Sequence, residues 1–183
     1  IHTAINENKK IKFKYYKWDI NKKLVPRHNG DWFVVSPWAL TWDDENYYMV
    51  AFDDLDQQIK HYRVDKMMRL SVEVEKRAGK DAFKNFDMAE YSKSTFGMYQ
   101  GKKTRVKIEF ANYMCGVFID RFGKDITFRP IDDEHSELHV DVNVSRQFFG
   151  WIFSLGKDVK VTGPSEVVEE MKEAAKEFLS NLE

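Results

Sequence analysis

Three short segments decide the fold of this chain: VVSPWAL at residues 34–40, YYMVA at 47–51 and HYRVDKM at 61–67. They are rich in Val and aromatic residues, which favour the pleated, half-buried surface of a strand. The stretches between them are acidic and polar, as is typical of turns. The sequence therefore predicts three consecutive strands joined by tight turns.

The residues around these segments extend the same pattern. Ile11–Tyr15 alternates strictly between apolar and polar residues, which indicates a half-buried strand with Ile11, Phe13 and Tyr15 pointing inward. Pro37 lacks a backbone N–H, so it indicates either an edge position or a bulge. The nearly continuous apolar run at 47–52 indicates a strand that is buried on both sides. We expect strands at 11–15, 32–40, 47–52, 59–64 and 70–74, a spacing typical of a small barrel or sandwich.

The second half of the chain has a different rhythm. Residues 76–103 are rich in Lys, Gly and Ser and carry scattered rings, including Tyr99, so we expect a linker that packs down through those rings. Beyond it, strands and helices alternate. Asn112 and Ser145 are the expected N-caps of the two internal helices, which Gly123 and Gly156 end. The predicted order is βαββαβ, followed by a last helix that Pro164 opens, and it matches the ferredoxin-like motif.

The overall composition is that of a globular protein. The chain has 183 residues, of which 43% are hydrophobic, 32% charged and 15% aromatic. The single cysteine, Cys115, cannot form an internal disulfide, so we expect a reducing cytoplasm. No apolar run approaches 18 residues, so we expect no membrane span. The chain begins at Ile1 instead of Met, and we expect that an upstream part was removed or not included.

Charge is distributed unevenly along the chain. The net charge of −1 is not that of a generally basic nucleic-acid binder. Residues 1–27, however, hold eight Lys or Arg against two acids, and residues 164–183 hold six Glu against two Lys. These segments are either two solvated faces of opposite sign, or the basic segment borders an anion-binding surface.

The motifs of common catalytic sites are missing from the sequence. It has no Gly-rich phosphate loop, no His-Glu-x-x-His, no Gly-x-Ser-x-Gly and no Cys-x-x-Cys pair. The acidic turn at 53–56 lacks the Gly and the terminal Glu of a calcium loop. We therefore expect no enzyme, no cofactor and no metal site.

The order of these segments resembles a WYL domain over residues 1–77. The Trp-Tyr-Leu positions that name this family are filled here by Tyr47, Tyr48 and Met49, and Asp65–Lys66 stands where the family has Asp-Arg. The second half resembles the C-terminal extension that often follows this domain. The residues that carry this second resemblance are Trp151–Gly156, Val159–Val161 and Gly163–Pro164.

The resemblance implies a mixed β and α+β fold. It places a small Sm-like or SH3-like β-barrel at residues 1–77, an ordered linker at 78–103 and a ferredoxin-like α/β sandwich domain at 104–183. It also implies the ligand-sensing part of a bacterial transcriptional regulator. In such proteins a winged helix-turn-helix that binds DNA usually precedes the barrel, and it is absent from this sequence. The family further implies a homodimer and a barrel pocket that binds a nucleotide or a short single-stranded nucleic acid.

Three residues of the central strands are the first candidates for that pocket. His61 and Arg63 share one face of an alternating strand, and a guanidinium can fork onto two phosphate oxygens. The alternative for Arg63 is a surface salt bridge with Asp65 or Asp44. Tyr48 can stack on any base, or it can be a core residue of the barrel.

Four further residues complete the predicted ligand-binding set. Ser36 could donate to a phosphate and Trp38 could stack on a base, or they are a hydroxyl at a bulge and a ring in the core. Lys14 and Tyr16 lie in the basic first strand and could support an anion.

Two functions of different classes remain open from the sequence. The chain is either the effector-sensing part of a regulator, or a protein–protein interaction and dimerisation module without a small ligand. The second function predicts dimerisation without ligand and no salt-sensitive affinity for nucleic acid.

Overall fold

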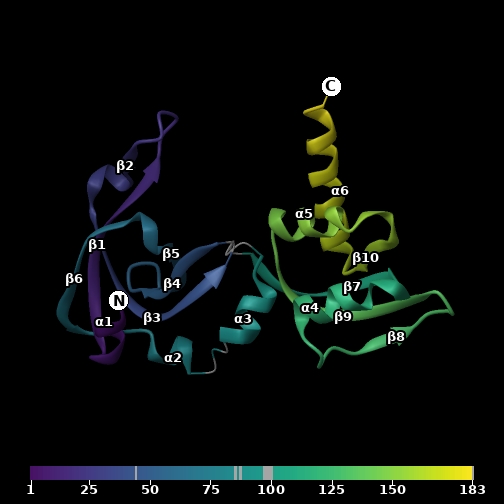
Figure 1. Cartoon of the computed structure of the whole chain (residues 1–183), viewed down its shortest axis with the longest axis horizontal. Coiled ribbons are helices and arrows are strands. Elements are labelled where there is room, and N and C mark those ends of the chain that lie inside the picture. Colours follow the sequence, from purple (N-terminus) through teal and green to yellow (C-terminus); the bar gives the residue numbers. More distant parts are fainter. Residues whose placement is uncertain (44, 85, 87, 97–100, 183) are drawn as a thin grey trace. The chain divides into compact units, whose positions relative to one another are not determined.

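The computed structural model divides the chain into two compact units, Ile1–Phe86 and Asp87–Glu183, which we call unit 1 and unit 2 (Figure 1). It describes residues 1–43, 45–84, 86, 88–96 and 101–182, with the backbone alone at 89 and 90. Asp44 and Tyr99, which the sequence interpretation names, lie outside the described residues. The domain boundaries predicted from the sequence stay a prediction.

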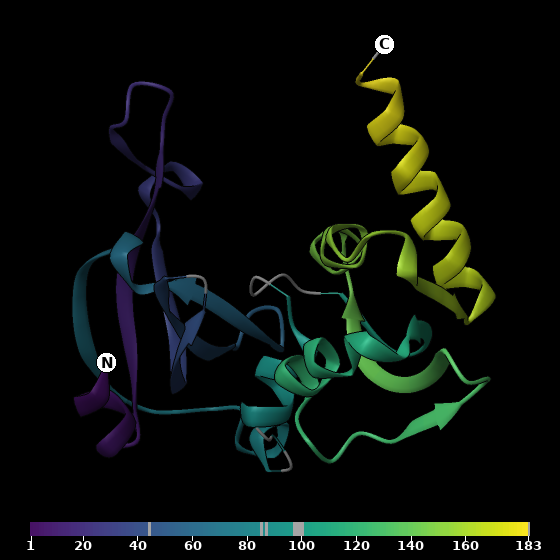
Figure 2. The ribbon, with the colours of Figure 1, turned by 45° about the vertical axis from the view of Figure 1, so that its right-hand side comes forward.

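Unit 1 is built mainly from strands. Its elements are α1 (His2–Asn6), β1 (Lys9–Trp18), β2 (Leu24–Pro26), β3 (Trp32–Asp43), β4 (Asn46–Asp53), β5 (Gln58–Arg63), β6 (Met67–Lys76) and α2 (Lys80–Phe83). Each of the five strands predicted from the sequence overlaps one of these. The prediction missed β2, which forms with the end of β1 a hairpin that projects from the rest of unit 1 (Figures 1 and 2).

The strands of unit 1 form one antiparallel sheet in the order β2-β1-β3-β4-β5, with β6 paired to the other side of β1. β1 pairs with β2, β3 and β6 at different parts of its length. The sheet curls so that β1 and β5 come close together: the Tyr15 hydroxyl on β1 accepts a hydrogen bond of 3.0 Å from the backbone N–H of Arg63 at the end of β5. Among the described residues β5 and β6 do not pair, so the sheet is not a closed barrel. Its concave face holds a core of Ala4, Ile11, Phe13, Tyr15, Val35, Met49, Ala51, Tyr62 and Met67.

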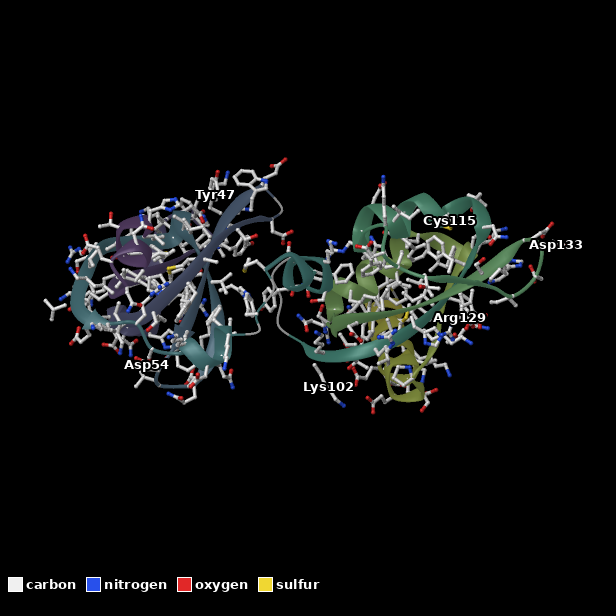
Figure 3. The ribbon with its side chains drawn as sticks, turned by 90° about the horizontal axis from the view of Figure 1, so that it is seen from below. Tyr47, Asp54, Lys102, Cys115, Arg129 and Asp133 are labelled. Atoms are coloured by element: carbon white, nitrogen blue, oxygen red, sulfur yellow. The ribbon has the colours of Figure 1, made fainter. Side chains whose placement is uncertain are left out.

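Two features of β3 and β4 test the sequence interpretation. The β3–β4 register shifts between Pro37 and Ala39, which confirms the bulge. The alternative prediction from Pro37, that its strand lies at the edge of the sheet, is wrong, since β3 lies between β1 and β4. Burial on both faces is confirmed for Met49–Phe52 but wrong for Tyr47, which is 58% exposed. Tyr47 lies at the outer end of the β3–β4 hairpin, beyond the core (Figure 3).

The convex face of unit 1 is partly covered by the segment that follows β6. Val50 and Phe52 point away from the concave core and are nonetheless buried. Gly79 lies against the ring of Phe52 so closely that a Cβ would overlap it, and its φ of +79° favours glycine. The Phe83 ring stacks on Trp38 at 4.8 Å between centroids. The first residues of the predicted linker therefore pack onto unit 1.

Unit 2 combines an antiparallel sheet with helices. Its elements are α3 (Met88–Ser94), β7 (Lys102–Ala111), α4 (Cys115–Phe122), β8 (Phe128–Pro130), β9 (His135–Val144), α5 (Arg146–Ser154), β10 (Val159–Gly163) and α6 (Ser165–Ser180). From β7 onward this confirms the predicted order of elements. The strand order in the sheet is β10-β7-β9-β8, and every pair is antiparallel.

One face of this sheet packs on α4 and α5, and the core between them is rich in Phe. Its fully buried members include Val106, Ile108, Phe110, Phe118, Leu138, Val142 and Phe148. The C-terminal half of α6 extends beyond the rest of unit 2 (Figures 1 and 2). No helix within the described residues is both long and apolar enough to cross a membrane.

Of the two N-caps predicted for the internal helices, the one at Ser145 is confirmed and the one at Asn112 is wrong. Ser145 is the N-cap of α5, and its hydroxyl accepts a hydrogen bond of 3.2 Å from the Phe148 N–H. The predicted cap at Asn112 is wrong, because a 3₁₀ turn precedes α4 and moves its N-cap to Met114. The Asn112 side chain instead donates to the Asp133 carbonyl and accepts from the Ser136 hydroxyl.

Candidate functional site

Adjacent strands bring three of the predicted site residues together. The β4–β5 register places Tyr48 directly opposite Arg63 and Val50 opposite His61. Residues that are opposite in an antiparallel pair share a face, and alternate residues of one strand do so too. Tyr48, His61 and Arg63 therefore lie on one face, the convex one, while Tyr62 points into the concave core. We call these three residues the β4–β5 cluster.

Arg63, the last residue of β5, forms a two-point ion pair with Asp65. Its Nε donates to Asp65 Oδ1 at 3.0 Å, and its Nη2 donates to Asp65 Oδ2 at 2.9 Å. This hydrogen-bonded guanidinium lowers the pKa of Asp65. The two side chains are 30% and 48% exposed, and ion pairs this accessible to water contribute at most about 1 kcal/mol. The guanidinium of Arg63 thus already binds a carboxylate through both of its oxygens. Replacing the Asp65 carboxylate with the anionic group of a ligand costs little free energy, because the exposed ion pair is weak.

His61 enters this cluster as a neutral group. Burial lowers the pKa of its imidazole from 6.5 to about 4, so the ring carries no charge at neutral pH. A neutral imidazole offers one hydrogen-bond donor and one acceptor. The positive charge of the β4–β5 cluster is therefore that of Arg63 alone.

Ser36 and Trp38 hold the segment after β6 in place. The buried Ser36 hydroxyl accepts from the Ala78 N–H at 2.9 Å, and the Trp38 indole N–H donates to the Ala78 carbonyl at 2.9 Å. The guanidinium of Arg77 lies 4.1 Å from the centroid of the Trp38 ring. These contacts are the ones expected of a hydroxyl at a bulge and a packed ring. A ligand role for these two residues stays a prediction.

Lys14 belongs to a second, basic group on β1 and the start of β3. Its Nζ lies 4.5 Å from the centroid of the Trp32 ring and also donates to the Gly30 carbonyl. Lys12 lies over the same ring at 5.7 Å. Trp32 is 46% exposed, so two ammonium groups surround an accessible indole. Tyr16, opposite Pro26 in the β1–β2 pair, lies two residues beyond Lys14.

Sequence reasoning missed two aromatic residues, Trp32 and Trp42, which lie near opposite ends of β3. Lys14 and Trp32 are paired across β1 and β3, and this pairing could have been found only with the strand register. Trp42 is paired with Tyr47 across β3 and β4, with ring centroids 4.7 Å apart. Both rings are more than half exposed, which a strand buried on both sides does not predict.

Metal binding finds no support in the described part of the chain. It contains no group of three or more His, Cys, Asp or Glu side chains that could hold a metal ion. His135, the first residue of β9, contacts Asp132 of the preceding acidic turn, with its Nδ1 3.0 Å from Oδ1. That carboxylate also accepts from the Glu134 and His135 backbone N–H groups, so it stabilises the turn.

Comparison with known proteins agrees with this architecture. The family model described as the WYL domain matches residues 1–72, and the one described as the WCX domain matches residues 102–179. A search of the curated proteins finds no match.

Two solved structures show the extent of the similarity. A CRISPR Cas-related protein is 15% identical with a TM-score of 0.51, and the match covers 100% of this chain and 51% of that one. The proteasome accessory factor B/C (PafBC) of Arthrobacter aurescens is 16% identical with a TM-score of 0.39 over 94% of this chain and 25% of that one. This chain thus spans about half and about a quarter of the lengths of these two proteins. Together, the two family matches show that the chain carries a WYL domain followed by a WCX domain.

Proposed function

We propose that this chain is the effector-sensing part of a bacterial transcriptional regulator. Its WYL domain binds an anionic nucleotide or a short single-stranded nucleic acid. Binding shifts the protein between two arrangements and so controls a DNA-binding domain outside this sequence. The role is regulatory binding and involves no catalysis.

The observation that carries this proposal is the two-point ion pair of Arg63. A phosphate offers a pair of oxygens as the Asp65 carboxylate does, and the terminal phosphate of a nucleotide also carries a second negative charge at neutral pH. Tyr48, opposite Arg63, places a ring beside this group, where a base can stack. His61 supplies a neutral donor to the ligand, because burial keeps its imidazole uncharged at neutral pH.

The basic group on β1 extends the proposed surface. Lys14, Tyr16 and the exposed Trp32 combine positive charge with rings, as is usual in proteins that bind single strands. Ser36 and Trp38 remain in the proposed set, and in the structure both bind the backbone of Ala78 in the segment after β6. We propose that they act on the ligand through that segment.

The finer architecture is also a proposal. We propose that unit 1 is an incomplete barrel of the Sm-like or SH3-like class, since its strands other than β2 follow the order β6-β1-β3-β4-β5. We propose that unit 2 is a ferredoxin-like α/β sandwich, supported by its element order and its antiparallel strand order. A cytoplasmic homodimer that reaches DNA through an N-terminal helix-turn-helix completes the proposal.

One observation favours the second function, an interaction module without a small ligand. A groove of about 620 Å³ lies between α5 and α6, and its lining is mostly apolar. Phe153, Phe178 and Leu179 are large apolar residues of this groove that remain exposed. Such a surface is typical of a contact between protein chains.

The experiment that separates the two functions is a binding titration. A fluorescein-labelled single-stranded oligonucleotide is titrated with the protein at several salt concentrations, and its anisotropy is measured. Sensing predicts saturable binding that weakens with salt and falls about tenfold or more in Arg63→Ala. Arg146→Ala is the matched control, because it also removes an Arg from a surface ion pair. Flat titrations, together with a dimer in light scattering, would favour the interaction module.

A further inference from the structure

Unit 2 contains a polar notch at the exposed edge of its sheet. β8 is short and pairs with β9 only at residues 136–138, so within the described residues β9 has no strand beside it further along that edge. α3, the end of α4 and the loop 123–127 surround this edge and leave a cavity of about 360 Å³. This volume is at the lower end of the range of small-molecule sites.

Basic side chains from three separate elements line the notch. They are Lys93 from α3, Arg105 from β7 and Arg129 from β8. The acids of the lining are Asp125 and Asp141, so its permanent charges sum to a net positive value. His139 of β9 and the hydroxyl of Thr127 add further hydrogen-bonding groups.

Of the three basic residues that line the notch, only Arg105 has an acidic partner among the described residues. Asp141 lies 3.8 Å from Arg105. Among the described residues, no acidic side chain lies within ion-pair distance of Lys93 or Arg129. The charge of Arg129 (labelled in Figure 3) also acts on Lys107, because it opposes the rise in the pKa of Lys107 that Glu137 causes.

The ammonium group of Lys93 lies close to the backbone of Gly123, at the start of the loop. Gly123 follows the last residue of α4 with a φ of +94°, and a Cβ there would lie 2.7 Å from Lys93 Nζ. The missing side chain of Gly123 thus leaves room for the ammonium group, next to the carbonyl end of α4 that favours a positive charge. The backbone around the notch therefore accommodates this cation at one side of the cavity.

We propose that this notch of unit 2 is a phosphate-binding site, separate from the proposed nucleic-acid surface of unit 1. A phosphate group there is held by Lys93 and Arg129 from opposite elements, with Thr127 donating a hydrogen bond. Since Lys93 belongs to α3 and Arg129 to β8, the bound phosphate joins α3 to the sheet. The ligand class is a small phosphate monoester or free phosphate, which matches the size of the cavity.

The test uses the whole chain, with inorganic phosphate as the probe and sodium chloride at the same ionic strength as the reference. Phosphate can also reach Arg63, so binding is read at the backbone amides of Gly123 and Thr127 by NMR. The variants are Lys93→Gln and Arg129→Gln, whose side chains are exposed and dispensable for the core. Lys84→Gln, an exposed lysine of unit 1, is the matched control.

The expected result is a saturable shift of both amides with phosphate but not with chloride. Each notch variant weakens this binding about tenfold, as the loss of a charged hydrogen bond does, and Lys84→Gln leaves it unchanged. A second arm compares AMP with adenosine, and only AMP is expected to shift the amides. The proposal is overturned if phosphate does no more than chloride, or if both notch variants bind as the wild type does.

Discussion

Acidification should destabilise unit 1 through a single residue, His61. Burial lowers the pKa of this imidazole from 6.5 to about 4. The unfolded chain therefore takes up a proton at a higher pH than the folded chain does. The contribution of neutral His61 to stability is complete above about pH 6.5 and is lost as the pH falls toward 4.

The size of the loss follows from the two pKa values. Each pH unit between them corresponds to about 1.4 kcal/mol of differential protonation. At pH 5 the solution is 1.5 units below the unfolded value of 6.5 and still above the folded value of about 4. The free energy of unfolding should therefore be about 2 kcal/mol lower at pH 5 than at pH 7.5.

Urea denaturation at the two pH values measures this difference. Four of the five tryptophans, at positions 18, 32, 38 and 42, belong to unit 1, so their fluorescence reports mainly its unfolding. His61→Gln stays neutral throughout and should lose most of this pH dependence, whereas His2→Gln, at an exposed histidine, should keep it. Asp53 and Asp65 have lowered pKa values, so they titrate below this range. Equal losses in the wild type and His61→Gln would refute the reasoning.

Three substitutions test the packing. Gly79→Ala should destabilise unit 1 by about 1–3 kcal/mol in urea denaturation, because its Cβ would overlap Phe52 and its φ is positive; an unchanged midpoint would contradict the described cover of the convex face. Ser145→Ala should cost unit 2 about 1 kcal/mol in thermal melting by circular dichroism, through the lost cap hydrogen bond to Phe148; Ser145→Asn should retain most of it. Phe118→Ala should cost about 3–5 kcal/mol in the same assay, since the ring is fully buried, and a loss below 1 kcal/mol would place Phe118 outside the core.

The strands and caps with strong local signals could be predicted from the sequence. The alternation at Ile11–Tyr15 identifies the inward residues of β1 because a strand has a side-chain period of two. Pro37 indicates a bulge because it cannot donate to the ladder. Ser145 caps α5 since its hydroxyl replaces a missing backbone partner of the first turn.

The features that depend on long-range packing could not be predicted in this way. Asn112 has the chemistry of a cap, but tertiary contacts with Asp133 and Ser136 take its side chain elsewhere. The apolar run through β4 shows that both faces need cover, but not that Gly79 and the segment around it supply it for Phe52. Of the candidate site, the shared face of His61 and Arg63 follows from alternation, whereas the pairing of Arg63 with Tyr48 needs the register.

The central claim is that the fork of Arg63 binds phosphate in the WYL domain, and Arg63→Lys tests it most directly. This variant keeps the positive charge but loses the two-point geometry seen with Asp65. Anisotropy of a labelled single-stranded oligonucleotide at fixed salt should show about tenfold weaker binding than in the wild type. Binding of Arg63→Lys as tight as that of the wild type would contradict the account.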